Sequence, residues 1–429
     1  MRELTDYHCY FGYGGWDDAM IPQKNILDIL EPASVNAHNT TDYDIVRESL
    51  LNPIHSPRLA SMVKGCSKIL ILADDYTRLT PAHLILPLLL EELVAGGITI
   101  NSITILVASG THRCMDDQEK RKKYGDQIVN SIPVVDHVWH NPDSLQSLGK
   151  TAQGTEIEIN KKLLEADFVI GIGHIVPHRV AGFSGGAKIV QPGVCGAKTT
   201  GQTHWLSAKY FSGKQIIGVT DNPVREEINE VGLKAGLQFI INTVQAGDGH
   251  IHSCFSGDPI VAHNEGCKAS LLVYGAPVSG LADIVIVDSF PANVNMWQAS
   301  KGVYSADLAL EEDGLLILVT PCPEGVAHEH PEIEHFGYAD PDSIERMVDC
   351  DQLDDLTIAA HILHVGRVIT GKRKAILVTP GIPQSVVEHL GFIWAANLEE
   401  AVGIGFKLKG KHASVSILRH GGEVMPIYG

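Results

Sequence analysis

Short, uninterrupted apolar runs constrain the fold of this chain most. Each is followed by a turn and then by a helical pattern, and the runs lie at 68–74, 103–108, 168–172, 284–287, 315–319 and 375–378. The predicted helices lie at 81–93, with Thr80 as N-cap, and at 222–236, 258–274 and 354–369. Continuous apolar strands that alternate with helices indicate a mostly parallel sheet covered on both faces, so the fold class is α/β.

The length predicts two domains. At 429 residues the chain exceeds one ordinary core. We expect an N-terminal cofactor-binding and catalytic α/β domain at 1–275 and a smaller C-terminal α/β domain at 281–413, with the active site in the cleft between them. The closing segment, 414–429, can join either domain, and a return to the first is kept open.

Charge and composition exclude several classes of partner. Lys and Arg number 33 against 51 Asp and Glu, a formal charge of −18 that repels nucleic acid and anionic lipid. The start of the chain has no signal-peptide pattern, and no apolar run approaches the about 20 residues that cross a bilayer. The eight scattered cysteines contain no CxxC pair, which favours reduced thiols and a cytoplasmic protein.

Polar side chains follow the predicted strands at their carboxyl ends. Three successive strands lead into such groups: Asp75 and Arg78 after the first, His112 after the second, and His174 and His178 after the third. In the second domain the strand at 284–287 leads into a segment that holds Trp297, Gln298 and Lys301. Open parallel sheets bind ligands beyond these strand ends, so we expect the groups to converge.

The run 171–205 combines eight glycines with three histidines and three cationic side chains. Dense glycine lets a backbone approach a ligand closely, and it argues against a packed helix or a central strand in this run. Lys188 is displayed from GFSGGAK, and His204 follows in TTGQTHW. A lysine can bond covalently to a cofactor, and an imidazole can bind a metal. Together these residues suggest a cofactor site.

Other cofactor patterns are weak. Lys188 lacks the adjacent Ser or Thr of a phosphate loop, and Gly171–Gly173 is followed by Val176 where the dinucleotide fingerprint needs glycine. The histidines of the loop 328–335 invite a second metal site, although a solvated acidic loop is the favoured interpretation: they are His328, His330 and His335. His174 and Arg113 are more consistent with structural roles.

Five motifs in order, ADDYTRLTP, ASGTHR, PHRVAGFSGGAK, TTGQTHW and WQASKG, resemble the lactate racemase family over nearly the whole chain. The resemblance implies a nickel cofactor, the pyridinium-3-thioamide-5-thiocarboxylic acid mononucleotide, attached covalently to Lys188 and delivered by cofactor-maturation proteins. It implies His204 as the nickel ligand, in a square-planar set with two sulfurs and a ring carbon.

The same resemblance implies the remaining roles. The family inverts C2 of a 2-hydroxy acid by hydride transfer to and from the cofactor, with paired histidines as acid/bases; here these are His112 and His178. Arg78, Gln298 and Lys301 would hold the substrate carboxylate, and Asp75 would support the site.

The substrate is left open by the sequence. Trp297 stands where the family pattern leads us to expect tyrosine, and an indole favours apolar contact, so a short, lactate-like aliphatic 2-hydroxy acid is the preferred small-molecule substrate. A sugar acid or a 2-hydroxy diacid remains an alternative. A nicotinamide-dependent dehydrogenase and a non-catalytic cofactor carrier are the competing functions.

Overall fold

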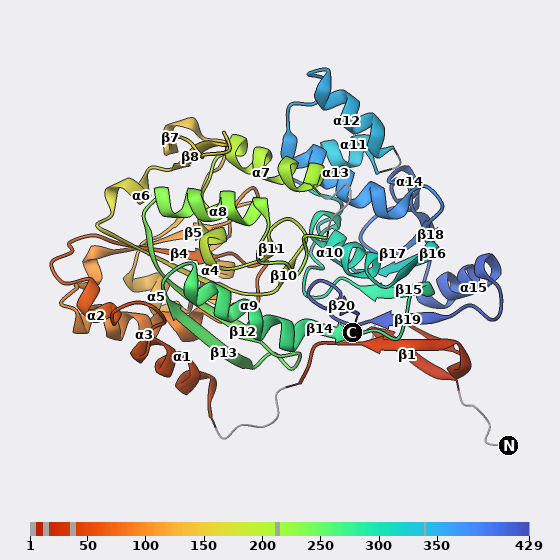
Figure 1. Cartoon of the computed structure of the whole chain (residues 1–429), viewed down its shortest axis with the longest axis horizontal. Coiled ribbons are helices and arrows are strands. Elements are labelled where there is room, and N and C mark those ends of the chain that lie inside the picture. The colour runs from red at the N-terminus through yellow and green to blue at the C-terminus, as the bar shows by residue number, and fades with distance from the viewer. Residues whose placement is uncertain (1–5, 12–16, 35–39, 211–214, 339, 429) are drawn as a thin grey trace. The chain divides into compact units, whose positions relative to one another are not determined.

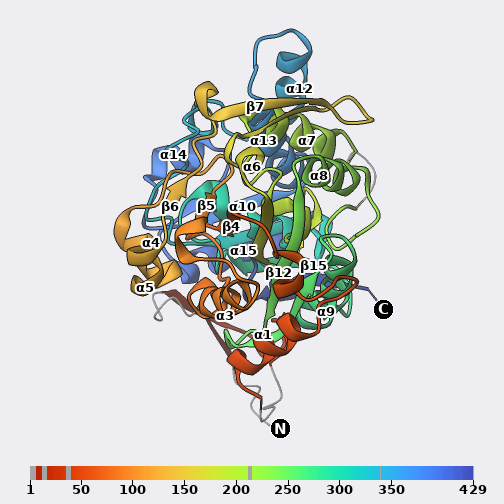
Figure 2. The ribbon, with the colours of Figure 1, turned by 90° about the vertical axis from the view of Figure 1, so that its left-hand side faces the viewer.

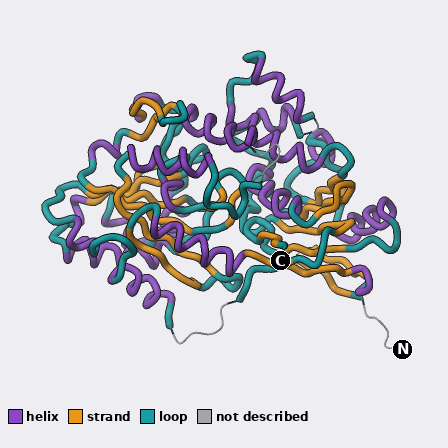
Figure 3. Tube along the Cα trace, viewed as in Figure 1, coloured by secondary structure: helices purple, strands orange, loops and turns teal. Residues whose placement is uncertain are grey.

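The computed structural model describes the whole chain except residues 1–5, 12–16, 35–39, 211–214, 339 and 429. The chain divides into two compact units. We call Ser34–Val273 the continuous unit, and Met1–Ala33 with Tyr274–Gly429 the discontinuous unit. Figure 3 shows helices and strands alternating along the trace, as the α/β prediction requires.

The continuous unit is built on a six-stranded sheet in the order β13-β12-β9-β4-β5-β6. All neighbours pair in parallel except β12 and β13. The strands are β4 (Ile69–Asp74), β5 (Ile103–Ala108), β6 (Val134–Asp136), β9 (Phe168–His174), β12 (Leu237–Gln245) and β13 (Ile251–Gly257). Two antiparallel pairs lie outside it: β7 (Leu145–Lys150) with β8 (Glu156–Asn160), and β10 (Pro177–His178) with β11 (Gly182–Phe183).

Helices cover both faces of this sheet, as Figures 1 and 2 show. One core joins the sheet to helices on the face of α1 and α3, and a second core joins the opposite face to α8. The helices are α1 (Asp42–Leu51), α2 (Leu59–Met62), α3 (Ala82–Ala95), η2 (Ile100–Ser102), α4 (Asp117–Tyr124), α5 (Asp126–Ser131), η3 (Pro142–Ser144), α6 (Lys162–Glu165), η4 (Gly186–Ile189), α7 (Ala197–Tyr210), α8 (Pro223–Lys234) and α9 (Val261–Tyr274). Burial on both faces explains why the central strands are continuously apolar.

The discontinuous unit has a second six-stranded sheet, fully parallel, in the order β18-β17-β16-β15-β19-β3. Its strands are β3 (Ile26–Leu30), β15 (Ala282–Asp288), β16 (Leu310–Val319), β17 (Lys374–Val378), β18 (Ile393–Ala395) and β19 (Val415–Leu418). Two smaller pairs join β1 (Tyr7–Phe11) to β2 (Asp17–Ile21) and β14 (Gly275–Pro277) to β20 (Met425–Ile427).

The helices of this unit are η1 (Gln23–Asn25), α10 (Met296–Asp307), α11 (Glu332–Phe336), α12 (Pro341–Asp349), α13 (Leu356–Ile369), α14 (Gln384–His389) and α15 (Leu398–Lys409). One core packs the sheet against α15 and the β1–β2 pair. The fold class is therefore as predicted: two α/β units with mostly parallel sheets.

The two units divide the chain differently from the predicted boundaries. Residues 1–33, which the sequence pattern assigned to the first domain, belong to the discontinuous unit, because β3 extends its sheet by pairing with β19. The closing segment, which the sequence left open to either domain, lies in the same unit, since β19 is inserted between β15 and β3 and its four residues are buried. A single short strand carries no local signal of which sheet it will join.

No helix of the described residues is long and apolar enough to cross a membrane. All eight cysteines lie in described segments, and each is a free thiol.

Candidate active site

The continuous unit places its site residues at a topological switch point. From β4 the chain moves to β5 and β6 on one side, and later returns to β9 on the other side of β4. The segments that follow β4 and β9 therefore leave in opposite directions, the arrangement at which open parallel sheets commonly bind ligands. Asp75 and Arg78 follow β4, and His178 and Lys188 follow β9. Asp75, Arg78 and His178 thus follow the strands after which the sequence pattern placed them.

Asp75 and His112 form a buried pair. His112 Nδ1 lies 2.6 Å from Asp75 Oδ2, and a carboxylate can only accept, so Nδ1 carries the proton and Nε2 carries the lone pair. Burial alone would raise the pKa of the Asp75 carboxyl, but the His112 imidazole, Arg78 and Thr77 together hold that pKa well below its usual range. Asp75 is thus ionised at neutral pH and orients His112 as a base.

Arg78 is tied to the same carboxylate through Thr77. The Thr77 hydroxyl donates to Asp75 Oδ1 at 2.6 Å and accepts from Arg78 Nη1 at 2.7 Å. The Thr77 amide also donates to Asp75 Oδ1, at 3.0 Å. These bonds hold the Arg78 side chain beside the pair. A guanidinium in this position can bind a carboxylate of a substrate.

His174 has a structural role, as predicted. It is the last residue of β9, and its Nδ1 lies 3.2 Å from Thr80 Oγ1 and 3.7 Å from Asp74 Oδ2. The Thr80 hydroxyl donates to Asp74, and Lys123 Nζ lies 2.9 Å from the other Asp74 oxygen. Thr80 therefore does not cap α3, whose N-cap is Pro81 without a side-chain bond. The prediction of a Thr80 cap was wrong, because the Thr80 hydroxyl is hydrogen-bonded to the buried Asp74 carboxylate instead.

His178 lies on the β10–β11 hairpin that follows β9. The backbone N–H of Val180 donates to His178 Nδ1 at 3.2 Å, so the ring proton of the neutral imidazole is on Nε2. His112 and His178 thus present opposite tautomers: the first offers a lone pair at Nε2, and the second offers a proton there. In these neutral forms His112 can accept a proton at Nε2, whereas the Nε2–H of His178 can donate a hydrogen bond to a ligand oxygen. Proton donation by His178 requires its imidazolium form.

Lys188 lies in the one-turn helix η4, which the glycine-rich segment 182–186 precedes. Gly185 and Gly186 have φ of 75° and 60°, a left-handed backbone that favours glycine. The pKa of the Lys188 amine is lowered well below its usual value by desolvation, then by Arg78 and Arg225, while Asp75 opposes the shift. Within the described chain the amine has no hydrogen-bond or ion-pair partner. A lowered pKa increases the fraction of uncharged amine, which is the nucleophilic form.

His204 lies in α7, where its Nδ1 is 2.8 Å from the Thr200 carbonyl oxygen. A carbonyl can only accept, so Nδ1 carries the proton and Nε2 has the lone pair that a metal requires. No group of three or more His, Cys, Asp or Glu side chains that could hold a metal occurs among the described residues. A metal at His204 would therefore take further ligands from a non-protein group.

The predicted exclusion of helix and central strand from the run 171–205 was wrong at both ends. Gly171–His174 lie in β9, which is flanked by β4 and β12, and residues 197–205 lie in α7. Gly171 fits in β9 because the Ile189 side chain packs where a larger residue would place its Cβ: a Cβ on Gly171 would lie 2.6 Å from Ile189 Cγ2. The irregular backbone that the glycines predict is confined to the residues between these elements.

In the discontinuous unit, α10 carries the predicted substrate residues. Its N-cap is Asn295, whose side chain accepts from the Gln298 amide at 3.0 Å. Lys301 Nζ donates to Gln298 Oε1 at 2.9 Å, one helical turn away. The pair thus presents an ammonium and an amide side by side, which suits a carboxylate.

Trp297 is held between two imidazoles. Its ring centroid lies 4.3 Å from that of His330 and 4.6 Å from that of His361, and both imidazole planes are nearly parallel to the indole, at 20° and 22°. His361 is itself bonded to the Tyr338 hydroxyl at 3.0 Å. The interpretation of the loop 328–335 as solvated holds for His328 and His335, which are exposed, and was wrong for His330, which is buried by the indole.

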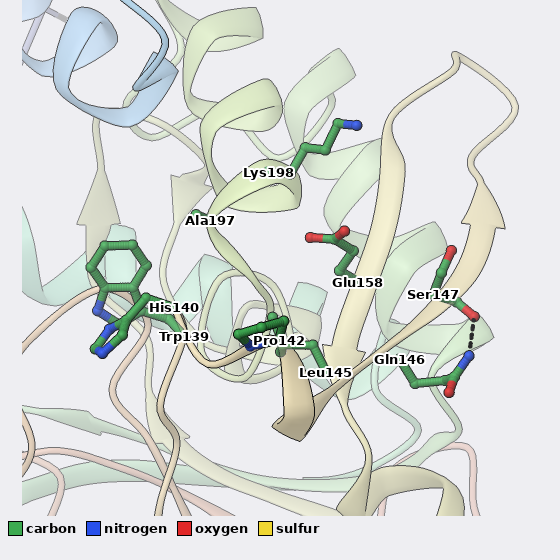
Figure 4. A pocket seen from close by; sticks show the side chains of 9 residues that line it. All are labelled: Trp139, His140, Pro142, Leu145, Gln146, Ser147, Glu158, Ala197 and Lys198. Atoms are coloured by element: carbon green, nitrogen blue, oxygen red, sulfur yellow. Dashed lines mark hydrogen bonds between the residues drawn. The ribbon is translucent and has the colours of Figure 1, made fainter.

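A surface pocket of about 410 Å³ lies elsewhere in the continuous unit. Figure 4 shows its lining around the start of α7 and the β7–β8 pair, including Trp139, His140, Glu158 and Lys198. It contains none of the predicted acid/base, cofactor or substrate residues.

The structure adds residues that sequence patterns missed. Arg225, His263 and Asn242 enclose the turn that carries Lys188, and they lie on α8, α9 and β12. Asn242 Oδ1 accepts from the Gly186 amide at 2.7 Å, and His263 Nε2 lies 2.9 Å from the Ser184 carbonyl oxygen. The sequence around each of them is typical of an ordinary helix or strand, so no local pattern predicts that they lie near Lys188.

Comparisons with known proteins agree with this architecture. Residues 6–213 match the model of the lactate racemase N-terminal domain, and residues 279–425 match that of the lactate racemase C-terminal domain. Two relatives named lactate racemase align over nearly the whole chain. The protein from Lactiplantibacillus plantarum is 30% identical over 94% of this chain and 95% of its own length, and that from Thermoanaerobacterium thermosaccharolyticum is 28% identical over the same shares.

Solved structures show the same fold. The lactate racemase apoprotein from Thermoanaerobacterium thermosaccharolyticum superposes with a TM-score of 0.85 at 26% identity, covering 98% of this chain and 100% of that one. A protein from Thermotoga maritima superposes with a TM-score of 0.74 at 22% identity, covering 92% and 100%. With both domain models matched in order and a relative at 30% identity over most of its length, this chain belongs to the lactate racemase family and is an isomerase of the racemase class.

Proposed function

We propose that this protein inverts C2 of a 2-hydroxy acid, with His112 and His178 as acid/bases and a nickel-pincer mononucleotide attached to Lys188. The observation that carries the proposal is the grouping at one sheet edge of the Asp75–His112 pair, Arg78 and a lysine with a lowered pKa. A dehydrogenase with nicotinamide would need the glycine fingerprint that the chain lacks.

The residues present fit such a cofactor. Lys188 supplies an uncharged amine for a covalent thioamide link, and Gly185 and Gly186 leave room for a ligand to approach the backbone. His204 supplies one imidazole lone pair, which suits a metal that receives its other ligands from the cofactor. When bound, the group supplies a hydride acceptor for C2. Delivery of the cofactor requires maturation proteins as partners.

The protein side chains then handle charge and protons. For one enantiomer, His112 Nε2 accepts the proton of the substrate hydroxyl, and the ionised Asp75 stabilises the imidazolium that results. The planar 2-keto acid is rebuilt from its other face, where His178 first takes a proton from solvent and then, as the imidazolium, returns that proton to the carbonyl oxygen. His112 releases the proton it accepted to solvent. Arg78 binds the substrate carboxylate, and we assign the same role to Gln298 and Lys301 on α10.

We assign a short, lactate-like 2-hydroxy acid as the substrate. The clamped indole of Trp297 precedes Gln298 on α10 and offers an apolar surface rather than a polar partner for further hydroxyl or carboxyl groups. Sugar acids and diacids are the alternatives that an assay must include.

Intact mass, metal analysis and a chiral assay test the proposal together. Protein produced with a cofactor supply should carry a mass increment, about one nickel per chain, and racemise at least one member of a panel of 2-hydroxy acids. Lys188→Ala should lose the increment and the activity. An active protein without nickel or the increment, or one that needs added nicotinamide, would refute the assignment. A nickel-loaded protein that leaves every optically pure acid unchanged would indicate a carrier.

A further inference from the structure

Arg225 is a buried cation whose side-chain hydrogen bonds, among the described residues, go to main-chain oxygens. It lies in the first turn of α8 and is 3% exposed. Its Nε donates to the Ala181 carbonyl at 3.2 Å, Nη1 donates to the Gly185 carbonyl at 3.3 Å, and Nη2 donates to the Phe183 carbonyl. No carboxylate of the described segments lies within ion-pair distance of this guanidinium.

This environment differs from that of three other arginines. Arg58, Arg113 and Arg373 each bond a carboxylate, at 2.6, 2.7 and 2.5 Å. A carboxylate satisfies the N–H groups and also cancels the charge, whereas carbonyl oxygens satisfy the N–H groups and leave the full charge in place. The field of Arg225 therefore acts on its surroundings at low dielectric.

The surroundings of Arg225 are the turn that carries Lys188. The three carbonyls belong to the glycine-rich segment that precedes η4. The fit of α8 against this turn is close, since a Cβ on Gly232 would lie 2.6 Å from the Cβ of Ala187. On the opposite side, a Cβ on Gly186 would lie 2.7 Å from the His263 ring. The turn cannot shift without disturbing α8 or α9.

From this geometry we propose that Arg225 is a positioning residue for Lys188. Its fork fixes the turn from Ala181 to Gly185, and its uncancelled charge keeps the Lys188 amine uncharged and nucleophilic. The inference rests on the proposed function in one respect: that function gives the reactive amine its use, which is to attach a cofactor.

The charged and titratable groups around the turn support one direction of effect. Desolvation and the cations Arg78 and Arg225 favour the uncharged amine, and Asp75 alone opposes them. Burial and Arg225 lower the pKa of His263 to about 3, so this ring is neutral. Burial raises the pKa of the Cys267 thiol to about 12, so it supplies no counter-charge. Arg225 is thus the cation of this group that no acidic side chain offsets.

The test measures the reactivity of the amine in the full chain produced without cofactor. Acetic anhydride is applied from pH 6 to 10, and acetylation of Lys188 is followed by peptide mass spectrometry, with the exposed Lys122 as internal reference. In the reaction the neutral nitrogen attacks a carbonyl carbon, the C–N bond forms, acetate leaves, and the proton goes to solvent. In the wild type, Lys188 should reach half-maximal rate at a lower pH than Lys122.

Arg225→Met should move the Lys188 midpoint upward by about one pH unit, which is about a tenfold loss of rate at pH 7. Arg58→Met removes an arginine that a carboxylate already offsets, and it should leave the midpoint unchanged. A folded Arg225→Met protein with an unshifted Lys188 midpoint would overturn the inference.

A second variant covers the case in which Arg225→Met does not fold. Cys267→Asp keeps the fork and adds a counter-charge beside Arg225, because Cys267 lies close enough to the guanidinium for a charge there to act on it. The same upward shift is expected, and an unchanged midpoint contradicts the inference. No cofactor enters these measurements, so the two proposals can fail separately. If the Lys188 midpoint shifts as expected but Lys188 never acquires the cofactor mass, the proposed function is refuted and this inference stands.

Discussion

Asp75 and Asp288 occupy matching places in the two sheets, yet their surroundings shift their pKa values in opposite directions. Asp75 follows β4, and Asp288 is the last residue of β15. Asp75 faces His112, Arg78 and Thr77, which lower its pKa despite burial. Burial raises the pKa of Asp288 to about 7. Its partners, backbone N–H groups such as that of Gly421 at 2.8 Å and the more weakly acting Arg419, lower the pKa but do not offset burial. A strand-end position therefore predicts where chemistry can occur, and the partners decide whether it does.

The largest effect that this comparison predicts is on turnover at the Asp75 edge. His112→Ala should lower kcat by about 10²–10⁴-fold while the cofactor mass and nickel content stay unchanged, because a positioned base contributes about this much. Racemisation rates in both directions and intact mass measure it. His250→Ala, an exposed histidine paired with Asp42, is the control and should be near wild type. Retained turnover in His112→Ala would remove the acid/base pair from the proposal.

The next effect is the pH dependence of stability contributed by Asp288. Its folded pKa of about 7 lies above the unfolded value, so its contribution is fully present below about pH 4 and is lost as pH rises through 7. The free energy of unfolding of the wild type should therefore fall by roughly 2–4 kcal/mol between those limits because of this group, and Asp288→Asn should not show that fall. Denaturant titrations at pH 4.5, 6 and 8 measure the slope. If wild type and variant keep parallel curves, the Asp288 carboxyl does not titrate in this range.

Asp75 should show the opposite sign. Its folded pKa is lowered, so its contribution to stability is present above the unfolded pKa of about 4 and is lost as pH falls through the folded pKa. Asp75→Asn should cost about 1–3 kcal/mol at pH 7, the range for a buried hydrogen bond to a charged group, and less at pH 3. The same titrations measure it. An equal cost at both pH values would show that packing, not charge, accounts for the loss.

The smallest effect concerns the rings that stack on Trp297 in the discontinuous unit. His330→Ala removes one side of the stack on Trp297, and stacking contributes about 0.5–1.5 kcal/mol, so KM for the preferred acid should rise roughly 2–10-fold with little change in kcat. Kinetics over the same panel of acids measure it. His328→Ala, exposed in the same loop, is the matched control. Equal effects of the two changes would mean that the clamp does not act on substrate.

Much of the site followed from local pattern alone. The strands at 68–74 and 103–108 are predicted by continuous apolar runs, and the strand-end rule places Asp75 and His112 at one sheet edge, where the structure pairs them. The proximity of Arg78 and Lys188 follows from the same rule, since β4 and β9 are neighbours. The roles of His178, His204, Gln298 and Lys301 still depend on family resemblance and the tests above.

The amino-acid sequence by itself determined which segments become strands and which polar groups stand at their ends, because both depend on neighbours a few residues away. Tertiary structure alone decided that β3 completes the second sheet, that glycines enter β9, and that His330 is buried against Trp297. It also decided that Arg225 contacts three carbonyls and, within the described part of the chain, no carboxylate. These outcomes depend on contacts between segments distant along the chain, and their energies arise only once the sheets have formed.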